Sequence, residues 1–236
     1  EDTRVSMKLL NHFGVKKPLI SYHEHNHVTA GQSVLNRLLA GESCALMTDA
    51  GTPAISDPGE DLVRLCAENG VEVRAIPGCC AAVNALAVSG LPTGRFTFEG
   101  FLTVNKKSRR EHLNSLKGET RTMIFHEAPH KLRTTLNDLT EAFGPDRRIS
   151  LCRELTKLHE EVLRFTLAEA VAYYEENAPK GEYVLVVAGA APKTGAVVTL
   201  EDSVAQVLAL KEQGMRLKDA AKEVAEHTGL SKNELY

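Results

Sequence analysis

The chain has 236 residues, of which 43% are hydrophobic and 25% charged, and its formal net charge is −3 at pH 7. This length suffices for one large or two small domains. The slightly acidic balance excludes a wholly basic nucleic-acid-binding protein but permits local basic patches. Apolar runs stay shorter than the roughly 18 residues of a membrane helix, so we expect neither a membrane span nor a signal peptide.

The five cysteines are odd in number and occur in apolar strings. This usage favours reduced, buried thiols in a cytoplasmic protein.

Helix and strand patterns alternate in the first 90 residues. The predicted strands are 18–22, 44–48 and 71–76, and the predicted helices are 5–13, 28–40, 60–68 and 80–89. Short connections between alternating elements are typical of an α/β fold with a mostly parallel sheet and helices on both faces. We therefore assign residues 1–92 to an N-terminal α/β domain.

Residues 93–190 contain more strands at mixed spacing. The predicted strands are 96–101, 122–125, 149–152, 161–165 and 183–188, and the predicted helices are 106–116, 130–143 and 167–177. This mixture predicts a C-terminal α+β domain with a mixed sheet, joined to the first domain near Gly90 to Arg95.

The composition changes after residue 190, where Ala190 to Gly195 has the character of a linker. Predicted helices at 203–212 and 217–227 flank a turn at Gly214, and this arrangement predicts a helix-turn-helix-like tail over residues 198–236. Contact with nucleic acid and a purely structural helical appendage remain equally favoured interpretations of this tail.

The segment Asp49–Gly59 follows a predicted buried strand and precedes a helix. Ligands bind at the carboxyl ends of strands in open α/β sheets. Glycine permits close approach of a ligand, proline stiffens the loop, and a carboxylate can accept hydrogen bonds from ribose hydroxyls or an ammonium group. We therefore predict that this loop forms the centre of the active site. The alternative is a structural turn in which Asp57 caps the next helix.

Three further segments follow predicted strands. Pro77-Gly78 opens a small-residue helix whose free N–H groups could hold an anion or an adenine edge, although such turns are commonly only structural. Segments 125–131 and 153–157 carry clustered polar residues that we expect at the same cleft, with salt-bridged surface loops as the alternative. The chain has neither GxGxxG nor GxxxxGK[ST], which argues against a standard dinucleotide or P-loop site.

Two groups of cationic or metal-binding residue types remain. Alternating histidines at positions 23, 25 and 27 are a possible metal-binding pattern, but a convincing further ligand is lacking, so we favour loop residues that face solvent or substrate and expect no metal. The basic run at 106–110 lies at a helix start, which is the unfavourable end for cations. This position makes phosphate binding more plausible for the run, and a solvated helix face is the equally favoured alternative.

Several motifs occur in a familiar order. They are Asp49–Gly59, Pro77-Gly78-Cys-Cys-Ala-Ala82, Gly90-Leu-Pro92, Phe98-Glu-Gly-Phe101 and Arg153-Glu-Leu-Thr-Lys157. In these motifs the chain resembles the small-subunit ribosomal RNA (cytidine-2′-O-)-methyltransferases, which belong to the tetrapyrrole-methylase-like class of S-adenosylmethionine-dependent enzymes. The resemblance covers essentially the whole chain. It implies two α/β domains, S-adenosylmethionine in the cleft between them, a homodimer, and small-subunit ribosomal RNA as the partner.

The resemblance also implies site residues. Those expected at the cofactor are Asp49, Ala50, Gly51, Thr52, Ile55, Pro77, Gly78, Cys80, Ala81, Glu127, Leu155, Glu182 and Tyr183. Candidates for contact with RNA phosphates come from the residues themselves and are Arg4, Arg153 and the basic run Lys106, Lys107, Arg109 and Arg110. For methyl transfer to a 2′-hydroxyl, a base or a cation that stabilises the developing alkoxide should help. The candidates are Glu1, Asp2, Glu154 and Lys157, among which the sequence does not choose.

The sequence departs from its relatives in two places. Cys80 and Ala81 stand where relatives often carry Thr-Ala or Ser-Ala, and the strand and Thr-Pro-Ile-Gly-Asn-Leu-like loop expected ahead of Glu1 are not in this sequence. A methyltransferase of the same class acting on a tetrapyrrole or another small molecule is the second interpretation, against which the basic helix and the tail argue. A non-catalytic RNA-binding assembly factor is the third.

Overall fold

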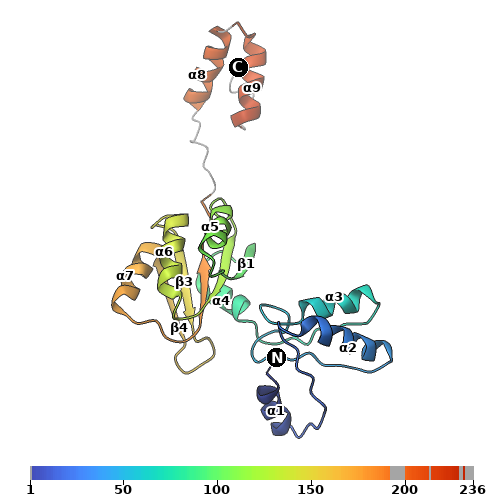
Figure 1. Cartoon of the computed structure of the whole chain (residues 1–236). Coiled ribbons are helices and arrows are strands. Elements are labelled where there is room, and N and C mark those ends of the chain that lie inside the picture. Colours follow the sequence, from blue (N-terminus) through green and yellow to red (C-terminus); the bar gives the residue numbers. More distant parts are fainter. Residues whose placement is uncertain (1, 192–199, 213, 229–230, 232–236) are drawn as a thin grey trace. The chain divides into compact units, whose positions relative to one another are not determined.

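The computed structural model describes residues 2–191, 200–212, 214–228 and 231. The chain divides into two compact units, residues 1–190 and residues 191–236, and each unit is described by itself (Figure 1). Within the described residues, no helix combines the length and the apolar character needed to cross a membrane.

A five-stranded mixed sheet is the framework of the larger unit. Its strands are β1 (Phe96–Phe101), β2 (Thr122–Glu127), β3 (Arg148–Arg153), β4 (Glu161–Thr166) and β5 (Tyr183–Val187). They lie in the order β1-β2-β5-β3-β4, in which β1 and β2 are parallel and the other neighbours antiparallel. The five strands predicted after residue 93, and their partly antiparallel pairing, are confirmed.

Helices cover both faces of this sheet (Figure 1). They are α4 (Ala81–Ser89), α5 (Lys106–Ser115), α6 (Leu132–Phe143) and α7 (Leu167–Glu176). Phe125 and Leu185 are fully buried on the face covered by α6 and α7, whereas Ile124 and Val186 are fully buried on the face covered by α4. The alternation follows from the two-residue period of a strand and explains why β2 and β5 are apolar on both sides.

Three further helices precede α4 in the chain: α1 (Thr3–His12), α2 (His27–Leu39) and α3 (Glu60–Glu68). Helices α2 and α3 pack together through a cluster that includes Val34, Leu62 and Cys66. The seven helices predicted before residue 190 are all present, with ends shifted by no more than two residues.

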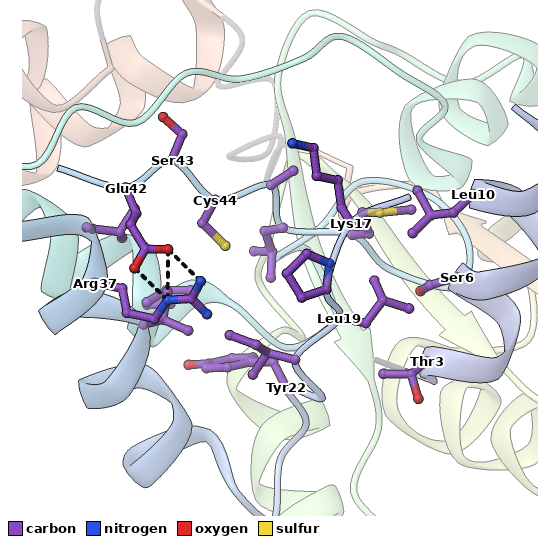
Figure 2. Close-up of a pocket in the computed structure, with 18 of the residues that line it drawn as sticks. Thr3, Ser6, Leu10, Lys17, Leu19, Tyr22, Arg37, Glu42, Ser43 and Cys44 are labelled. Atoms are coloured by element: carbon purple, nitrogen blue, oxygen red, sulfur yellow. Dashed lines mark hydrogen bonds and ion pairs between the residues drawn. The ribbon is translucent and has the colours of Figure 1, made fainter. Parts of the chain in front are cut away.

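The strands predicted at 18–22, 44–48 and 71–76 are not formed in the described residues, because none of these segments makes ladder pairs. Residues of the first two segments line one cavity of about 640 Å³ (Figure 2). In the third, Val73 and Ile76 are 50% and 86% exposed. The α/β class is confirmed, but the expected parallel N-terminal sheet is absent from the described residues.

The cysteines are all free thiols, as expected. Cys66 and Cys152 are buried, but Cys44 and Cys79 are exposed. The expectation of uniform burial is therefore wrong for these two, which lie in the unpaired segment 44–48 and in the loop after segment 71–76.

The smaller unit contains α8 (Leu200–Glu212) and α9 (Leu217–Thr228). The two helices pack through a small core of Val207, Ala220, Ala221 and Val224. The two helices predicted for the tail are thus confirmed, while the prediction that the tail extends to residue 236 involves positions outside the described residues.

Candidate active site

Two hydrogen bonds hold the loop Asp49–Gly59 in place. The Thr48 hydroxyl donates to the Asp57 carboxylate at 2.8 Å, and the Thr52 hydroxyl donates to the carbonyl oxygen of Cys79 at 2.9 Å. The second bond joins this loop to the loop that precedes α4. Helix α3 has Gly59 as its N-cap and no side-chain capping bond, so the alternative role of Asp57 as a helix cap is wrong.

Strained backbone is concentrated in two of the predicted site loops. Among the described residues, the non-glycine residues with positive φ are Ala54 (66°), Ser56 (60°), Glu154 (48°) and Thr156 (66°). This region of φ is costly for residues with a Cβ, above all for a β-branched one, and it clusters at functional sites. Its restriction to the segments 49–59 and 153–157 singles out both loops as a functional site.

A charged triad closes the second loop. The Lys157 ammonium lies 2.9 Å from both Glu154 Oε1 and Glu182 Oε2, and Glu154 Oε1 also accepts the backbone N–H of Glu182 at 2.9 Å. The Glu182 N–H bond and Lys157 lower the pKa of Glu154, and the two carboxylates raise the pKa of Lys157. At neutral pH Glu154 is therefore a weak base and Lys157 a cation.

The geometry makes Asp2 an equally weak base. Asp2 caps α1, and its carboxylate accepts hydrogen bonds from the Arg4 side chain and from the Arg4 N–H at 2.8 Å. These bonds lower the pKa of Asp2 to about 2. The Asp2 N–H donates to Asp49 at 3.2 Å, which places the start of α1 beside the first loop. The remaining candidate, Glu1, lies outside the described residues.

The apolar residues expected near the cofactor meet beneath these loops. Cys80 and Leu155 are half-buried and pack against the same cluster, formed by α4, β2, β3 and β5. The other residues of the first two motifs that were predicted at the cofactor are at least partly accessible: Asp49, Ala50, Gly51, Thr52, Ile55, Pro77, Gly78 and, at the start of α4, Ala81. A small apolar floor between polar loops suits a flat heteroaromatic ring.

His126 belongs to the polar segment 125–131 that the sequence placed at the cleft, although it was given no role of its own. Its ring contacts Phe98 and Phe101 edge-on, with centroids 5.1 and 5.4 Å apart. Burial lowers the pKa of His126, and the nearby carboxylates of Asp57 and Glu182 partly offset that effect. Its Nε2 atom is buried and has no hydrogen-bond partner. A buried unpaired nitrogen is costly, and a ligand that satisfies it would remove the cost.

Two other predicted side chains face away from His126. Glu127 is buried on the opposite face of the sheet, where its carboxylate accepts a hydrogen bond from Thr135. Tyr183, its register partner, packs edge-on against Tyr174 with centroids 5.9 Å apart. The strand period puts His126 on the face of α4 and Glu127 on the other, and this signal in the sequence could have identified the histidine.

The basic run on α5 divides into exposed and buried members. Arg109 is buried, with Nε 2.5 Å from Asp138 and Nη2 2.7 Å from the Thr135 hydroxyl. Two of its donor nitrogens are thus committed inside the fold, although Arg109 also lines the groove described next, and its expected RNA-binding role stays a prediction. The adjacent residues remain exposed and, with α6, form a groove of about 600 Å³ that contains Lys106, Arg110, Lys117, His130 and Lys131.

A glycine is required at position 181, beside the triad of Lys157, Glu154 and Glu182. Its φ is +75°, and an added Cβ would overlap the Glu154 side chain. We expect Gly181→Ala to lower the free energy of unfolding by about 2–3 kcal/mol, through backbone strain and displacement of Glu154. Gly70 is a matched control, since its φ is +70° and nothing lies within 4 Å of its added Cβ. Gly70→Ala should lower the free energy of unfolding, measured in urea, by only about 1 kcal/mol. Equal losses in the two variants would show that contact with Glu154 does not add to the cost at position 181.

The described residues contain no arrangement of three or more His, Cys, Asp or Glu side chains suited to a metal ion. His23 and His25 lie near one another, with ring centroids 5.9 Å apart. His27 instead bonds Asp61, with Nδ1 and Oδ2 2.6 Å apart. All three histidines line a cavity next to the first loop.

Two families match the chain. Tetrapyrrole (Corrin/Porphyrin) Methylases match residues 2–171, and the RsmI C-terminal HTH domain matches residues 198–236. Among solved structures, the methyltransferase CobJ is similar with a TM-score of 0.54 and 21% identity, over 77% of this chain and 78% of that chain. At this identity the likeness concerns the fold alone.

Curated relatives match the whole chain. Proteins named Ribosomal RNA small subunit methyltransferase I from Synechocystis sp., Halalkalibacterium halodurans and Escherichia coli O157:H7 are 47%, 46% and 42% identical to it. Each alignment covers 100% of this chain, and 85%, 82% and 82% of the respective relative.

Proposed function

The chain belongs to the tetrapyrrole (corrin/porphyrin) methylase family, and from this premise we propose that it transfers a methyl group from S-adenosylmethionine to the 2′-hydroxyl of a cytidine in small-subunit ribosomal RNA. The observation that carries the proposal is the full-length similarity, at 42–47% identity, to relatives named as ribosomal RNA small subunit methyltransferases. The match of residues 198–236 to the RsmI C-terminal HTH domain extends this similarity to the tail.

The residues present fit the cofactor. Cys80 and Leu155 offer an apolar floor for an adenine ring, Asp49 and Glu182 offer carboxylates for ribose hydroxyls or an ammonium group, and His126 offers an unpaired nitrogen. When bound, S-adenosylmethionine supplies a methyl group attached to a positively charged sulfur. The protein must orient the acceptor oxygen, and this positioning supplies much of the rate.

Lys157 is the group best suited to assist the acceptor oxygen. As a cation it stabilises negative charge that develops on a hydroxyl oxygen, and Glu154 and Glu182 fix its position. Glu154 then acts as a positioning residue. The pKa values of Asp2 and Glu154 are lowered, so both carboxylates are weak proton acceptors.

We propose that exposed basic side chains bind RNA phosphates. Arg110 lines the groove between α5 and α6, and Lys106 and Lys107 are exposed beside it. Arg4 and Arg153 complete the proposed set, and Arg4 is the more accessible because its side chain is 88% exposed. The proposal further includes a homodimer in the cytoplasm. Light scattering of the purified chain would test the homodimer.

The decisive experiment supplies the chain with labelled S-adenosylmethionine and small ribosomal subunits. We expect label in ribosomal RNA, released as 2′-O-methylcytidine after nuclease digestion and mass spectrometry. A tetrapyrrole precursor serves as the competing acceptor. Label in the tetrapyrrole and none in RNA would overturn the choice of substrate, and no heat of binding in a titration with S-adenosylmethionine would favour a non-catalytic binding protein.

A further inference from the structure

A polar cavity of about 790 Å³ lies next to the first loop. Its walls are the histidine segment 23–27, the stretch 54–61, Arg64 and Phe101. The strained residues Ala54 and Ser56 belong to one wall. The residues expected at the cofactor by motif, 49–52 and 77–81, are not among its lining residues. The cavity is therefore adjacent to the cofactor residues without being formed by them.

One wall of the cavity is an exposed aromatic ring. Phe101 is 57% exposed at the carboxyl end of β1, and its edge-on contact with His126 holds it in place. A Cβ built on the neighbouring Gly100 would lie 3.7 Å from the Ser56 hydroxyl, so the end of β1 touches the first loop. Exposed phenyl rings beside polar cavities provide stacking surfaces for nucleobases.

The charged part of the remaining lining consists of four carboxylates and Arg64, and three histidines lie beside them. The Arg64 guanidinium is paired with Glu68. Glu24 and Glu60 are exposed and form no ion pair among the described residues, whereas Asp57 and Asp61 are bonded to Thr48 and His27. Carboxylates accept hydrogen bonds from ribose hydroxyls and from the exocyclic amine of cytosine. They repel phosphate, so a ligand that suits this lining is a nucleoside whose phosphates lie outside the cavity.

One of the lining residues carries a buried polar atom without a partner. His23 lines the cavity, and its Nδ1 is buried and has no hydrogen-bond partner. A bound hydroxyl or amide group would satisfy it. The volume falls within the range of about 300–1,000 Å³ that small-molecule sites occupy, and it leaves room for a nucleoside.

We propose that this cavity holds the acceptor nucleoside, turned out of the RNA, with its pyrimidine base stacked on Phe101 and its sugar toward the loop Asp49–Gly59. The inference rests on the proposed function and deepens it. An enzyme that acts on a nucleotide held within RNA structure must expose it, and aromatic stacking compensates for lost stacking in the RNA.

The test compares Phe101 variants in methyl transfer to small ribosomal subunits. Phe101→Ala and Phe101→Leu should each lower kcat/KM by about tenfold or more, because stacking on an aromatic ring is lost. Phe101→Tyr keeps the aromatic face and should stay within about threefold of wild type. Phe96→Ala is the matched control, since Phe96 is 41% exposed on the same strand but does not line the cavity.

The affinity for S-adenosylmethionine, measured by titration calorimetry, separates the outcomes. An unchanged cofactor Kd in Phe101→Leu together with a lowered kcat/KM supports the acceptor site. A cofactor Kd that rises by the same factor as kcat/KM falls would overturn the proposal in favour of a cofactor cavity. A Phe101→Leu variant with the same kcat/KM as Phe96→Ala would also overturn the proposal. If the wild-type chain methylates no RNA, the proposed function fails and the inference falls with it. If the wild type methylates RNA and the Phe101 variants equal the control, the inference alone fails.

Discussion

Replacing Arg109 by alanine is expected to lower the free energy of unfolding by about 2–4 kcal/mol. The Arg109 guanidinium bonds Asp138 and the Thr135 hydroxyl, and that hydroxyl donates to the buried carboxylate of Glu127. Its removal leaves Thr135 without a donor, while Thr135 and Glu127 stay buried. The loss of the ion pair itself adds less, because the Asp138 side chain is 34% exposed and water can solvate it.

Arg110→Ala is the matched control on the same helix. The Arg110 side chain is 73% exposed and lies 3.8 Å from Glu141, which is 72% exposed. Exposed ion pairs contribute little, so this variant should unfold within about 1 kcal/mol of wild type. Urea unfolding followed by circular dichroism measures both. Equal losses in the two variants would show that the Arg109 network does not stabilise the fold. The proposed RNA role predicts the reverse order for RNA affinity. Arg110→Ala should weaken RNA binding more than Arg109→Ala, because it removes one phosphate contact.

The burial of Arg109 could not be predicted from the basic run in which it occurs. Arg109 and Leu113 are four residues apart on α5 and are its two buried residues. Lys106 lies about one turn before Arg109 and two turns before Leu113, so it shares their side of the helix, and yet it is exposed. Contacts with α6 make the difference, because the bonding partners of Arg109, Asp138 and Thr135, belong to that helix and are distant in the sequence.

Local patterns predicted the helices and the strands of the mixed sheet, but they failed where pairing partners are decisive. Segment 18–22 has the apolar character of a strand but lies across a cavity from segment 44–47. A strand exists only with a neighbour, and no local propensity supplies one. The motif loops were likewise found from the sequence. The left-handed backbone of Glu154 and Thr156 was not, because tertiary contacts impose it against local preference.

Lys157→Ala is expected to lower kcat about 10²- to 10³-fold, the loss seen when one preorganised donor to a developing oxyanion is removed. The affinity for S-adenosylmethionine should change little, because a cation gains nothing from approaching a sulfonium. Single-turnover methyl transfer to small ribosomal subunits measures the first quantity, and titration calorimetry measures the second. Lys180→Ala is the control, since Lys180 is exposed near the same loop and has no place in the triad.

The pH dependence distinguishes a cation from a base at position 157. The pKa of Lys157 is raised by Glu182 and Glu154, and the pKa of Glu154 is lowered by the Glu182 N–H and by Lys157. Between about pH 6 and 9 both groups keep their charges, so neither should produce an inflection in the rate. If Lys157 acted as the proton acceptor, the rate would instead rise steadily toward high pH as the ammonium lost its proton.

Glu154→Gln should lower kcat less than Lys157→Ala, because Glu182 still holds the ammonium at 2.9 Å. Unchanged turnover in both variants would remove the triad from the reaction and leave His126, with its unpaired nitrogen, as the next residue to replace.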